Sequence, residues 1–157
     1  MIELRDATVD DLDALAALWR DAWIDGHAAH VPAELLEQRT FESFRIRLER
    51  LLPDTRIAES GGRIAGFCSL KGDELNQIMV ARDARGGGVA AVLMADAEQR
   101  QRDRGLETIW LACAVGNDRA AAFYRKSGWR LTRTESLPVE TLGEPFPLDI
   151  WRFEKTL

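Results

Sequence analysis

Residues 80–91, VARDARGGGVAA, combine one arginine with three consecutive glycines between a β-rich run and an amphipathic helical pattern. Each glycine lowers the stability of regular structure by roughly 0.5–1 kcal/mol relative to alanine, but it lets the backbone bend sharply and approach a ligand closely. Just before a helix, such a loop directs free N–H groups and a positive partial charge to one point. Both features suit a phosphate group. We therefore predict a phosphate-binding loop for a nucleotide-containing cofactor.

Several loop chemistries compete for this stretch. A P-loop needs a lysine and a hydroxyl residue after its last glycine, and neither follows Gly88 in place. A dinucleotide fingerprint is matched formally by Gly86, Gly88 and Ala91. However, that unit lies mid-chain after an antiparallel hairpin, and little more than one βαβ unit follows it. A glycine-rich turn with no ligand leaves Arg85 unexplained. The phosphate loop is favoured, and a nucleotide-dependent oxidoreductase is kept as an alternative.

This loop and a second stretch together resemble the GCN5-related N-acetyltransferase (GNAT) family. Residues 85–90 (RGGGVA) are similar to the family's [QR]-x-x-G-x-[GA] acetyl-CoA signature. Residues 80–86 resemble its V-x-P-x-x-R-G segment, with Arg82 in place of the proline. Residues 117–129 (NDRAAAFYRKSGW) resemble its N-x-x-A-x-x-F-Y-x-x-x-G-[FW] motif. The two motifs stand at the family's spacing with no insertion between them.

The resemblance implies acetyl-CoA as the co-substrate. Backbone amides of the glycine loop and the Arg85 side chain would meet the pyrophosphate. The pantetheine arm would lie between the strands that end at Val80 and Val115. Arg119, Arg125 and Lys126 are candidates for the 3′-phosphate, the alternative being solvated charges near a helix end. The residues expected to bind the cofactor are Met79, Val80, Arg85, Gly86, Gly87, Gly88, Val89, Ala90, Asn117, Arg119, Tyr124 and Lys126.

Tyr124 is the predicted general acid. Attack of an amine on the thioester expels a thiolate whose parent thiol has a pKa of about 8.5 if it resembles cysteine. A tyrosine with a pKa of about 10 stays protonated at neutral pH and can donate to that sulfur. In the family, the tyrosine of this motif lies beside the sulfur; the alternative is that Tyr124 only packs. The base stays open among Glu74, a histidine (His27 or His30) and water.

The acceptor is expected to be a primary amine of a small molecule, an amino acid or a protein, attacked directly in a ternary complex. The early helices and residues 136–147 should shape its pocket, with His27, His30 and Trp23 as candidate contacts. Aromatic residues at helical spacing are also typical of a core, so this assignment has a structural alternative. A non-catalytic acyl-CoA-binding regulator of the same fold would share the glycine loop.

The elements expected around these residues follow from hydrophobic periodicity and turn residues. Gly61-Gly62 suits a two-residue hairpin turn. We expect strands at 2–7, 55–60, 63–70, 75–80, 108–115, 129–135 and 148–154. Helices are expected at 8–26, 32–53 with a break near Thr40, 89–104 and 117–127, and an exposed loop at Pro138, Pro145 and Pro147. The pattern predicts a mixed α/β fold of the GNAT type over residues 1–157 as a single domain. It should have about seven mostly antiparallel strands, a central βαβ unit and about four helices.

Composition narrows the class of protein further. The 157 residues carry a net charge of −5, which disfavours a nucleic-acid partner because phosphate contacts need clustered Lys and Arg. No stretch is apolar enough to span a bilayer and no secretory signal opens the chain, so we expect a cytoplasmic protein without a membrane partner. Two histidines and two separated cysteines supply no ligand cluster, so no metal is expected. Pairing into a homodimer is left open.

Overall fold

The computed structural model describes all 157 residues. Seven strands form one sheet in the order β1-β2-β3-β4-β5-β7-β6. The strands are β1 (Ile2–Asp6), β2 (Thr55–Ser60), β3 (Arg63–Lys71), β4 (Glu74–Val80), β5 (Thr108–Ala114), β6 (Arg130–Val139) and β7 (Phe146–Thr156). The α-helices are α1 (Leu12–His27), α2 (Ala33–Gln38), α3 (Phe41–Leu51), α4 (Val89–Asp103) and α5 (Asp118–Lys126). The predicted fold class is confirmed, with five α-helices rather than about four because a break at residues 39 and 40 separates α2 from α3.

All neighbouring strands are antiparallel except β4 and β5, which are parallel. The predicted Gly61-Gly62 hairpin joins β2 and β3, and both glycines have positive φ, 61° and 77°. A β-bulge in the β3–β4 pairing leaves Asn76 without a partner, since Ser69 pairs with Gln77 and Leu70 with Leu75. The βαβ unit β4-α4-β5 is the one place where the chain crosses over between parallel strands.

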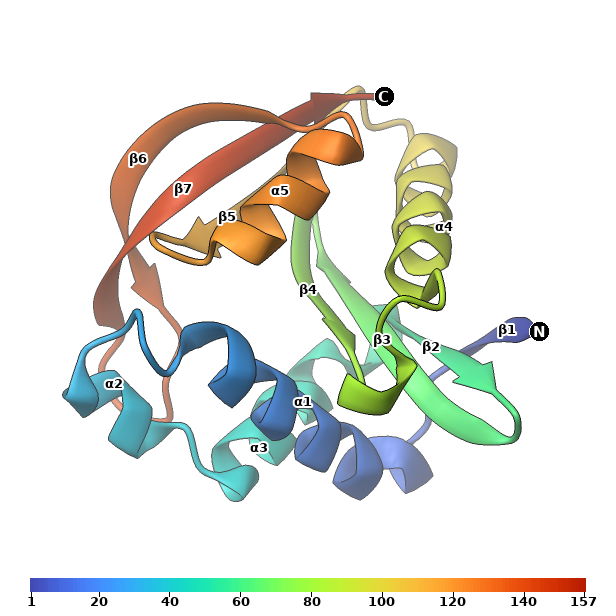
Figure 1. The fold of residues 1–157 in the computed structure, drawn as a ribbon, viewed down its shortest axis with the longest axis horizontal. Coiled ribbons are helices and arrows are strands. Elements are labelled where there is room, and N and C mark those ends of the chain that lie inside the picture. Colours follow the sequence, from blue (N-terminus) through green and yellow to red (C-terminus); the bar gives the residue numbers. More distant parts are fainter.

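The helices cover the sheet on both faces and create two hydrophobic cores (Figure 1). On one face α4 and α5 pack through Leu93, Met94 and Ala121 against the middle of the sheet. On the other face α1, α2 and α3 pack around Trp19 and Phe44. These two aromatic side chains are fully buried, so they form part of the core and do not line a substrate pocket. None of the helices combines the length and apolar character needed to cross a membrane.

The expectation of a long proline-marked loop is wrong in its extent. β6 runs on to Val139 and β7 begins at Phe146, so Pro138 and Pro147 face each other within the sheet. Proline has no backbone N–H and is tolerated where no neighbour needs that donor. β6 is the edge strand, and β5 pairs with β7 only from Ile150 onwards. Each proline therefore has one side on which no strand is paired, so its missing N–H is not needed there.

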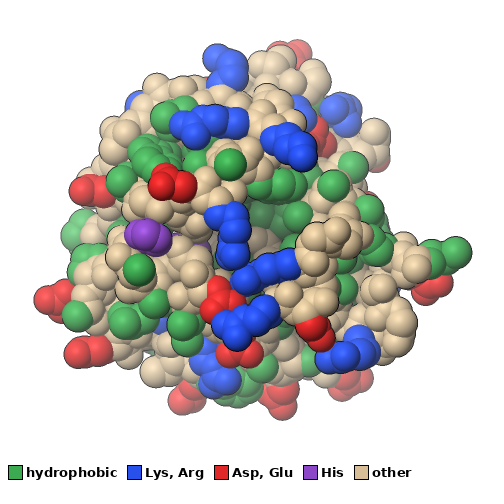
Figure 2. All heavy atoms as spheres, viewed as in Figure 1, with side chains coloured by type: hydrophobic (Ala, Val, Ile, Leu, Met, Phe, Trp, Pro, Cys, Tyr) green, Lys and Arg blue, Asp and Glu red, His purple; other side chains and the backbone are tan.

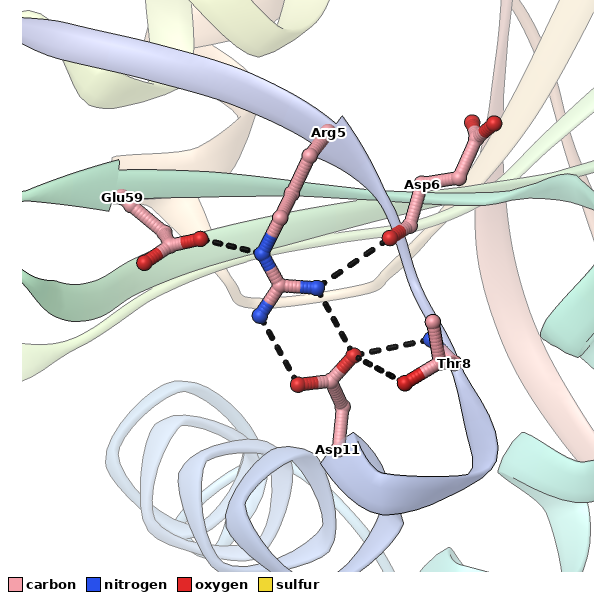
Figure 3. A network of polar contacts seen from close by, with 5 residues as sticks. All are labelled: Arg5, Asp6, Thr8, Asp11 and Glu59. Atoms are coloured by element: carbon pink, nitrogen blue, oxygen red, sulfur yellow. Dashed lines mark hydrogen bonds and ion pairs between the residues drawn. The ribbon is translucent and has the colours of Figure 1, made fainter.

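A polar network fixes the start of α1 against the edge of the sheet (Figure 3). Arg5 on β1 forms a two-pronged ion pair with Asp11, with N···O distances of 2.9 and 2.8 Å, and also donates to Glu59 on β2. Asp11 accepts a further bond from the backbone N–H of Thr8 at 2.8 Å. The hydrogen bond from Arg5 is the main cause of the lowered pKa of Asp11, which is about 2, and the bond from Thr8 lowers it further. The network orients α1, whose C-terminal end reaches the candidate site.

Candidate active site

The two parallel strands at the centre of the sheet diverge and leave a cavity between them. β4 and β5 share a single register pair, Glu74 with Trp110, next to a backbone bond from Trp110 N–H to the Asp73 carbonyl at 3.1 Å. Beyond that point the strands separate, as Figure 1 shows, and a cavity of about 530 Å³ opens along them. Residues from β4, the glycine loop, α4, β5 and α5 line it, together with Gly26 and His27 of α1. The cavity lies between the strands where the pantetheine arm is expected.

The glycine loop lies at the mouth of this cavity and leads directly into α4. Gly86 and Gly88 have φ values of 80° and 84°, in the left-handed region that favours glycine. No other atom lies within 4 Å of the position where a Cβ would stand on either residue. Gly88 is the N-cap of α4, and the first amides of a helix have no carbonyl one turn earlier to bond. The loop thus presents free donors and the positive end of α4 to open space, as an anion requires.

Basic side chains gather around the hollow on this face (Figure 2). Arg85, Arg119 and Lys126 all line the cavity, the latter two from α5. Arg85 also donates to Asp25 of α1 at 3.0 Å, and Arg82 donates to the same carboxylate through Nε at 3.1 Å. The hydrogen bonds from Arg82 and then Arg85 lower the pKa of Asp25. The predicted anion-binding arginine is therefore in place and is held by an acid 60 residues away.

α5 brings the second motif to the opposite wall of the cavity. Asn117 caps this helix, since its Oδ1 accepts from the Ala120 N–H at 3.3 Å. The Asn117 side chain lies close to α1, because a Cβ on Gly26 would stand 3.2 Å from its Nδ2. Tyr124 projects from α5 between Phe123 and Phe153, with ring centroids 5.7 and 5.6 Å away. Both Asn117 and Tyr124 line the cavity.

The Tyr124 hydroxyl is poised to donate rather than to ionise. It forms no hydrogen bond with another protein group, and the ring faces the cavity. Burial raises the pKa of Tyr124 above its usual value, with a smaller contribution from Cys113. Burial also raises the pKa of the Cys113 thiol, which lies in the same cavity, to about 12. A phenol that stays protonated and a thiol that resists ionisation therefore lie side by side at this wall.

A second cavity of about 320 Å³ lies beside the first, towards α1, α3 and the end of β6. His27, Asn76, Gln77 and Ala112 line both cavities, so the two spaces meet between β4 and β5. Glu74 lines the second cavity and accepts from Asn76 Nδ2 at 3.0 Å. Burial raises the pKa of Glu74 above its usual value. This carboxyl is therefore easier to protonate than an exposed glutamate.

His27 stands where the two cavities meet, and it is neutral at pH 7. Its ring stacks on Trp23 with centroids 5.1 Å apart, and Nδ1 donates to the Trp23 carbonyl at 3.1 Å. Burial, helped by the nearby cations Arg39 and Arg47, lowers the pKa of His27 to about 4. With Nδ1 carrying the proton, Nε2 is an acceptor. A base with so low a pKa takes up a proton weakly at neutral pH.

The structure brings most of the sequence-predicted residues together and leaves three aside, one of which is Arg125. Gly87 lies in the loop but lines neither cavity. His30 also lines neither; it packs against Gly116, where a Cβ would stand 2.9 Å from its Nδ1. Trp23 and His27 line the second cavity, as does Glu74. The remaining predicted residues, Met79, Val80, Arg85, Gly86, Gly88, Val89, Ala90, Asn117, Arg119, Tyr124 and Lys126, line the first.

Sequence reasoning missed the two arginine partners of Asp25 and two arginines of the second cavity, Arg39 and Arg47. Asp25 gave no local signal, because its partners lie 57 and 60 residues further along the chain. Arg47 did give one. It follows Phe44 by three residues and precedes Leu48, so it falls on the apolar face of α3. A cation on such a face is unusual and marks a residue with a special environment.

Comparison with known proteins supplies further findings. The sequence model of the acetyltransferase (GNAT) family matches residues 12–129. The peptidyl-lysine N-acetyltransferase YjaB of Salmonella typhimurium is 29% identical over 165 residues, covering 94% of this chain and 95% of that protein. An uncharacterized N-acetyltransferase of Mycobacterium bovis is 33% identical over 99 residues, 57% of this chain and 64% of that protein's length. The PaiA N-acetyltransferase of Thermoplasma acidophilum, solved with coenzyme A, shares the fold with a TM-score of 0.74 and 20% identity, over 100% of this chain and 99% of that one.

Proposed function

Because the chain belongs to the acetyltransferase (GNAT) family, we propose that it transfers the acetyl group of acetyl-CoA to a primary amine. The Thermoplasma relative of the same fold is a complex with coenzyme A, and the Salmonella relative is named as an N-acetyltransferase. Both names support acetyl-CoA as the co-substrate of this chain. A metal has no part in the proposal, since no cluster of three or more His, Cys, Asp or Glu side chains is present.

One observation carries the proposal: two cavities share four lining residues, His27, Asn76, Gln77 and Ala112, where β4 and β5 separate. The first has the anion-binding loop and the α4 N-terminus at its mouth and Tyr124 on its wall. The second holds Glu74 and is lined on several sides by apolar residues. A thioester lying in the first would present its carbonyl to an amine arriving from the second. The reacting groups would then meet near His27 and Gln77, which line both.

Acetyl-CoA fits the first cavity by chemical character. Pyrophosphate would take the free amides at Gly88, Val89 and Ala90 and the charge of Arg85. Arg119 and Lys126 would meet the 3′-phosphate. β5 has no register pair with Val80, so the backbone of Val80 is available to the amide groups of pantetheine, whereas the Met79 carbonyl is turned towards Gly66 of β3. Asn117 would contact the same arm from α5.

The proposed chemistry is direct attack of the amine on the thioester. The amine nitrogen bonds to the acetyl carbon, the carbon–sulfur bond breaks, and the leaving sulfur takes a proton from the Tyr124 hydroxyl. A raised pKa keeps that proton in place until the thiolate forms. The alternative of an acetyl-cysteine intermediate is disfavoured, because a thiol with a pKa of about 12 supplies almost no thiolate at neutral pH.

Glu74 is the proposed base. The attacking amine must lose a proton, and a carboxylate accepts one more readily as its pKa rises towards the working pH. Burial raises the pKa of Glu74, whereas it lowers that of His27, so the two candidates are separated in favour of the carboxylate. The position of Glu74 on the second cavity suits a proton transfer directly or through water.

The test is initial-rate kinetics with a panel of amines, following thiol release from acetyl-CoA and the mass of the acetylated product. Direct transfer predicts double-reciprocal lines that intersect when both substrates are varied. Parallel lines, or a stable acetyl-protein in the absence of amine, would point to a covalent route instead. A non-catalytic regulator of the same fold would bind acetyl-CoA and release no thiol with any amine.

We also infer a cytoplasmic location, which is supported by two free and buried cysteines. Structural cysteines in oxidising compartments are usually paired, whereas unpaired thiols are the rule in the cytoplasm. Burial keeps both pKa values near 12, so these thiols are inert. A homodimer stays a prediction that the oligomeric mass in solution would test.

A further inference from the structure

The second cavity contains two buried arginines that form no direct ion pair with a carboxylate. Arg39, at the end of α2, and Arg47, on α3, have only 7% and 6% of their surface exposed. Neither forms an ion pair within 4 Å of a carboxylate. Nε and Nη1 of Arg47 and Nε of Arg39 are buried without any hydrogen-bond partner. An uncompensated buried cation is strongly unfavourable, so folded proteins retain one where a ligand of opposite charge completes the site.

The contacts that these arginines do make hold them at the cavity wall without satisfying their charge. The Arg47 guanidinium lies over the Trp19 ring at 4.3 Å from the centroid, and that of Arg39 lies 5.8 Å from the Trp23 ring. Arg39 Nη1 donates to the Glu140 carbonyl at 2.6 Å. Stacking on aromatic rings fixes the planes of both side chains. The open donors of the two guanidinium groups are therefore fixed in position before a ligand arrives.

The acidic groups around this cavity are already engaged. The Glu140 carboxylate pairs with Arg50. Glu74 accepts from Asn76. Burial lowers the pKa of Arg39 to about 10 and that of Arg47 to about 9, so both remain charged at pH 7. Lys71 adds a third cation to the lining. The positive charge of the cavity exceeds the negative charge by one.

Half of the lining residues are hydrophobic, and the space is small. Trp23, Leu35, Trp110, Leu148 and Ile150 line it, and its volume of about 320 Å³ is at the lower end of small-molecule pockets. A ligand that fits would join an apolar body to an anionic group. The proposed reaction also requires that the amino group of this ligand lie next to the first cavity, where the thioester would bind.

We propose that the amine acceptor is a small amino acid-like molecule with an apolar side group, whose carboxylate is bound by Arg47 and Arg39. This inference rests on the proposed function and specifies its substrate class. A guanidinium binds a carboxylate through two parallel N–H···O bonds, and both arginines line the cavity. The fold thus selects its acceptor by a charge at the end opposite to the reacting nitrogen.

The first experiment compares matched acceptors that differ only in the anion. Leucine, leucinamide and 3-methylbutylamine form one set, and phenylalanine, its amide and phenethylamine form another. Rates are expressed per unprotonated amine, because the three nitrogens in each set differ in basicity. The free acid should have a kcat/KM at least tenfold above its amide and its decarboxylated analogue. Equal or better rates for the neutral amines, or for a lysine side chain within a neutral peptide, would overturn the proposal and leave acetyl transfer standing.

The second experiment removes one cation. Arg47→Met keeps much of the side-chain length without its charge, and Arg45→Met on the same helix removes an exposed arginine that pairs with Asp13 and Glu49. Arg47→Met should raise the KM for leucine at least tenfold, abolish the preference over leucinamide and leave the KM for acetyl-CoA unchanged. Arg45→Met should keep the preference. A preference that survives Arg47→Met would contradict the assignment.

Binding of the reaction product separates this inference from the proposed function. N-acetylleucine should raise the melting temperature of the wild-type protein, whereas N-acetylleucinamide at the same concentration should not. This measurement needs no turnover and no variant, so it decides the matter even if Arg47→Met does not fold. If N-acetylleucine raised the melting temperature of a protein that acetylates no amine, the anion site would be supported and the proposed enzymatic function would be contradicted. No shift with either product would contradict the anion site.

Discussion

Asp25 near the end of α1 accepts a hydrogen bond from Arg85 Nη2 at 3.0 Å and thereby ties the glycine loop to the first helix. The same carboxylate accepts from Arg82, so two loop arginines share one acid. Arg85 is also the arginine that the proposed function assigns to pyrophosphate. In the absence of a ligand, its charge is balanced by Asp25. A bound cofactor would have to share Arg85 with this carboxylate.

The first prediction concerns this competition. Asp25→Asn should tighten acetyl-CoA binding several-fold, and more at low salt than at high salt, because it removes a negative charge beside the proposed pyrophosphate site. Asp13→Asn makes the same change in net charge at the far end of α1 and should leave the affinity as it is. Calorimetric titration at two salt concentrations measures the effect. Weaker binding by Asp25→Asn would mean that the acid orients Arg85 instead of competing for it.

A second prediction separates backbone strain from cofactor binding at Gly88. An alanine at this position must adopt a φ of 84°, which costs roughly 1–2 kcal/mol, although no neighbouring atom would clash with its Cβ. Gly105→Ala at the other end of α4 imposes nearly the same strain at a φ of 82°. The two variants should lose similar stability in denaturant unfolding. Only Gly88→Ala should weaken acetyl-CoA binding, by tenfold or more. An equal loss of acetyl-CoA affinity in both variants would contradict a role of the loop in cofactor binding.

Tyr124→Phe provides a third prediction, about turnover. The lost hydroxyl bonds to no protein group, so stability and acetyl-CoA affinity should hardly change, while kcat should fall about 100-fold as expected for a missing general acid. Because Tyr124 is the single tyrosine of the chain, its ionisation can be followed directly by ultraviolet absorbance. Burial raises its pKa, so the phenol should remain neutral at pH 10. An unchanged kcat would restrict Tyr124 to packing.

The pH dependence of stability tests the environment of His27. Its folded-state pKa of about 4 lies below the value of about 6.5 of an exposed histidine, so protonation favours the unfolded chain. The contribution of His27 is complete above pH 6.5 and is lost as the pH falls from 6.5 towards 4. His27→Phe keeps a ring that can stack on Trp23 and should flatten the decline in melting temperature between pH 7 and pH 5. A decline as steep as in the wild type would place the responsible group elsewhere.

Local patterns were sufficient to predict most of the fold. Gly61-Gly62, the glycine loop and Asn117 each act through nearby backbone geometry, and the structure places them in the predicted hairpin, helix start and helix cap. The loop predicted at Pro138 and Pro147 was wrong, because a proline excludes a strand only where the neighbouring strand needs a backbone N–H at that position. That depends on strand order across the whole sheet, which local reasoning does not contain.

The cofactor side of the site was predictable in the same way, whereas the acceptor side was not. Motif residues such as Arg85 and Tyr124 are recognised by spacing, and both line the first cavity. The second cavity, which is the proposed acceptor site, is assembled from α1, α2, α3, β3, β4, β5, β6 and β7, so its residues share no continuous segment. Arg47 was visible as a cation on an apolar helix face, but its lack of a partner emerges only from the packing.

The central claim is that the cavity between β4 and β5 holds acetyl-CoA, and a thermal-shift titration of the unmodified protein tests it most directly. Acetyl-CoA, CoA, NAD and ATP are added separately over the same concentration range. A ligand present at 100 times its dissociation constant stabilises the folded state by about 2.7 kcal/mol, which is readily visible as a higher melting temperature. We predict saturable shifts with acetyl-CoA and CoA that exceed those with NAD or ATP. A shift with NAD alone, or no shift with acetyl-CoA, would contradict the account.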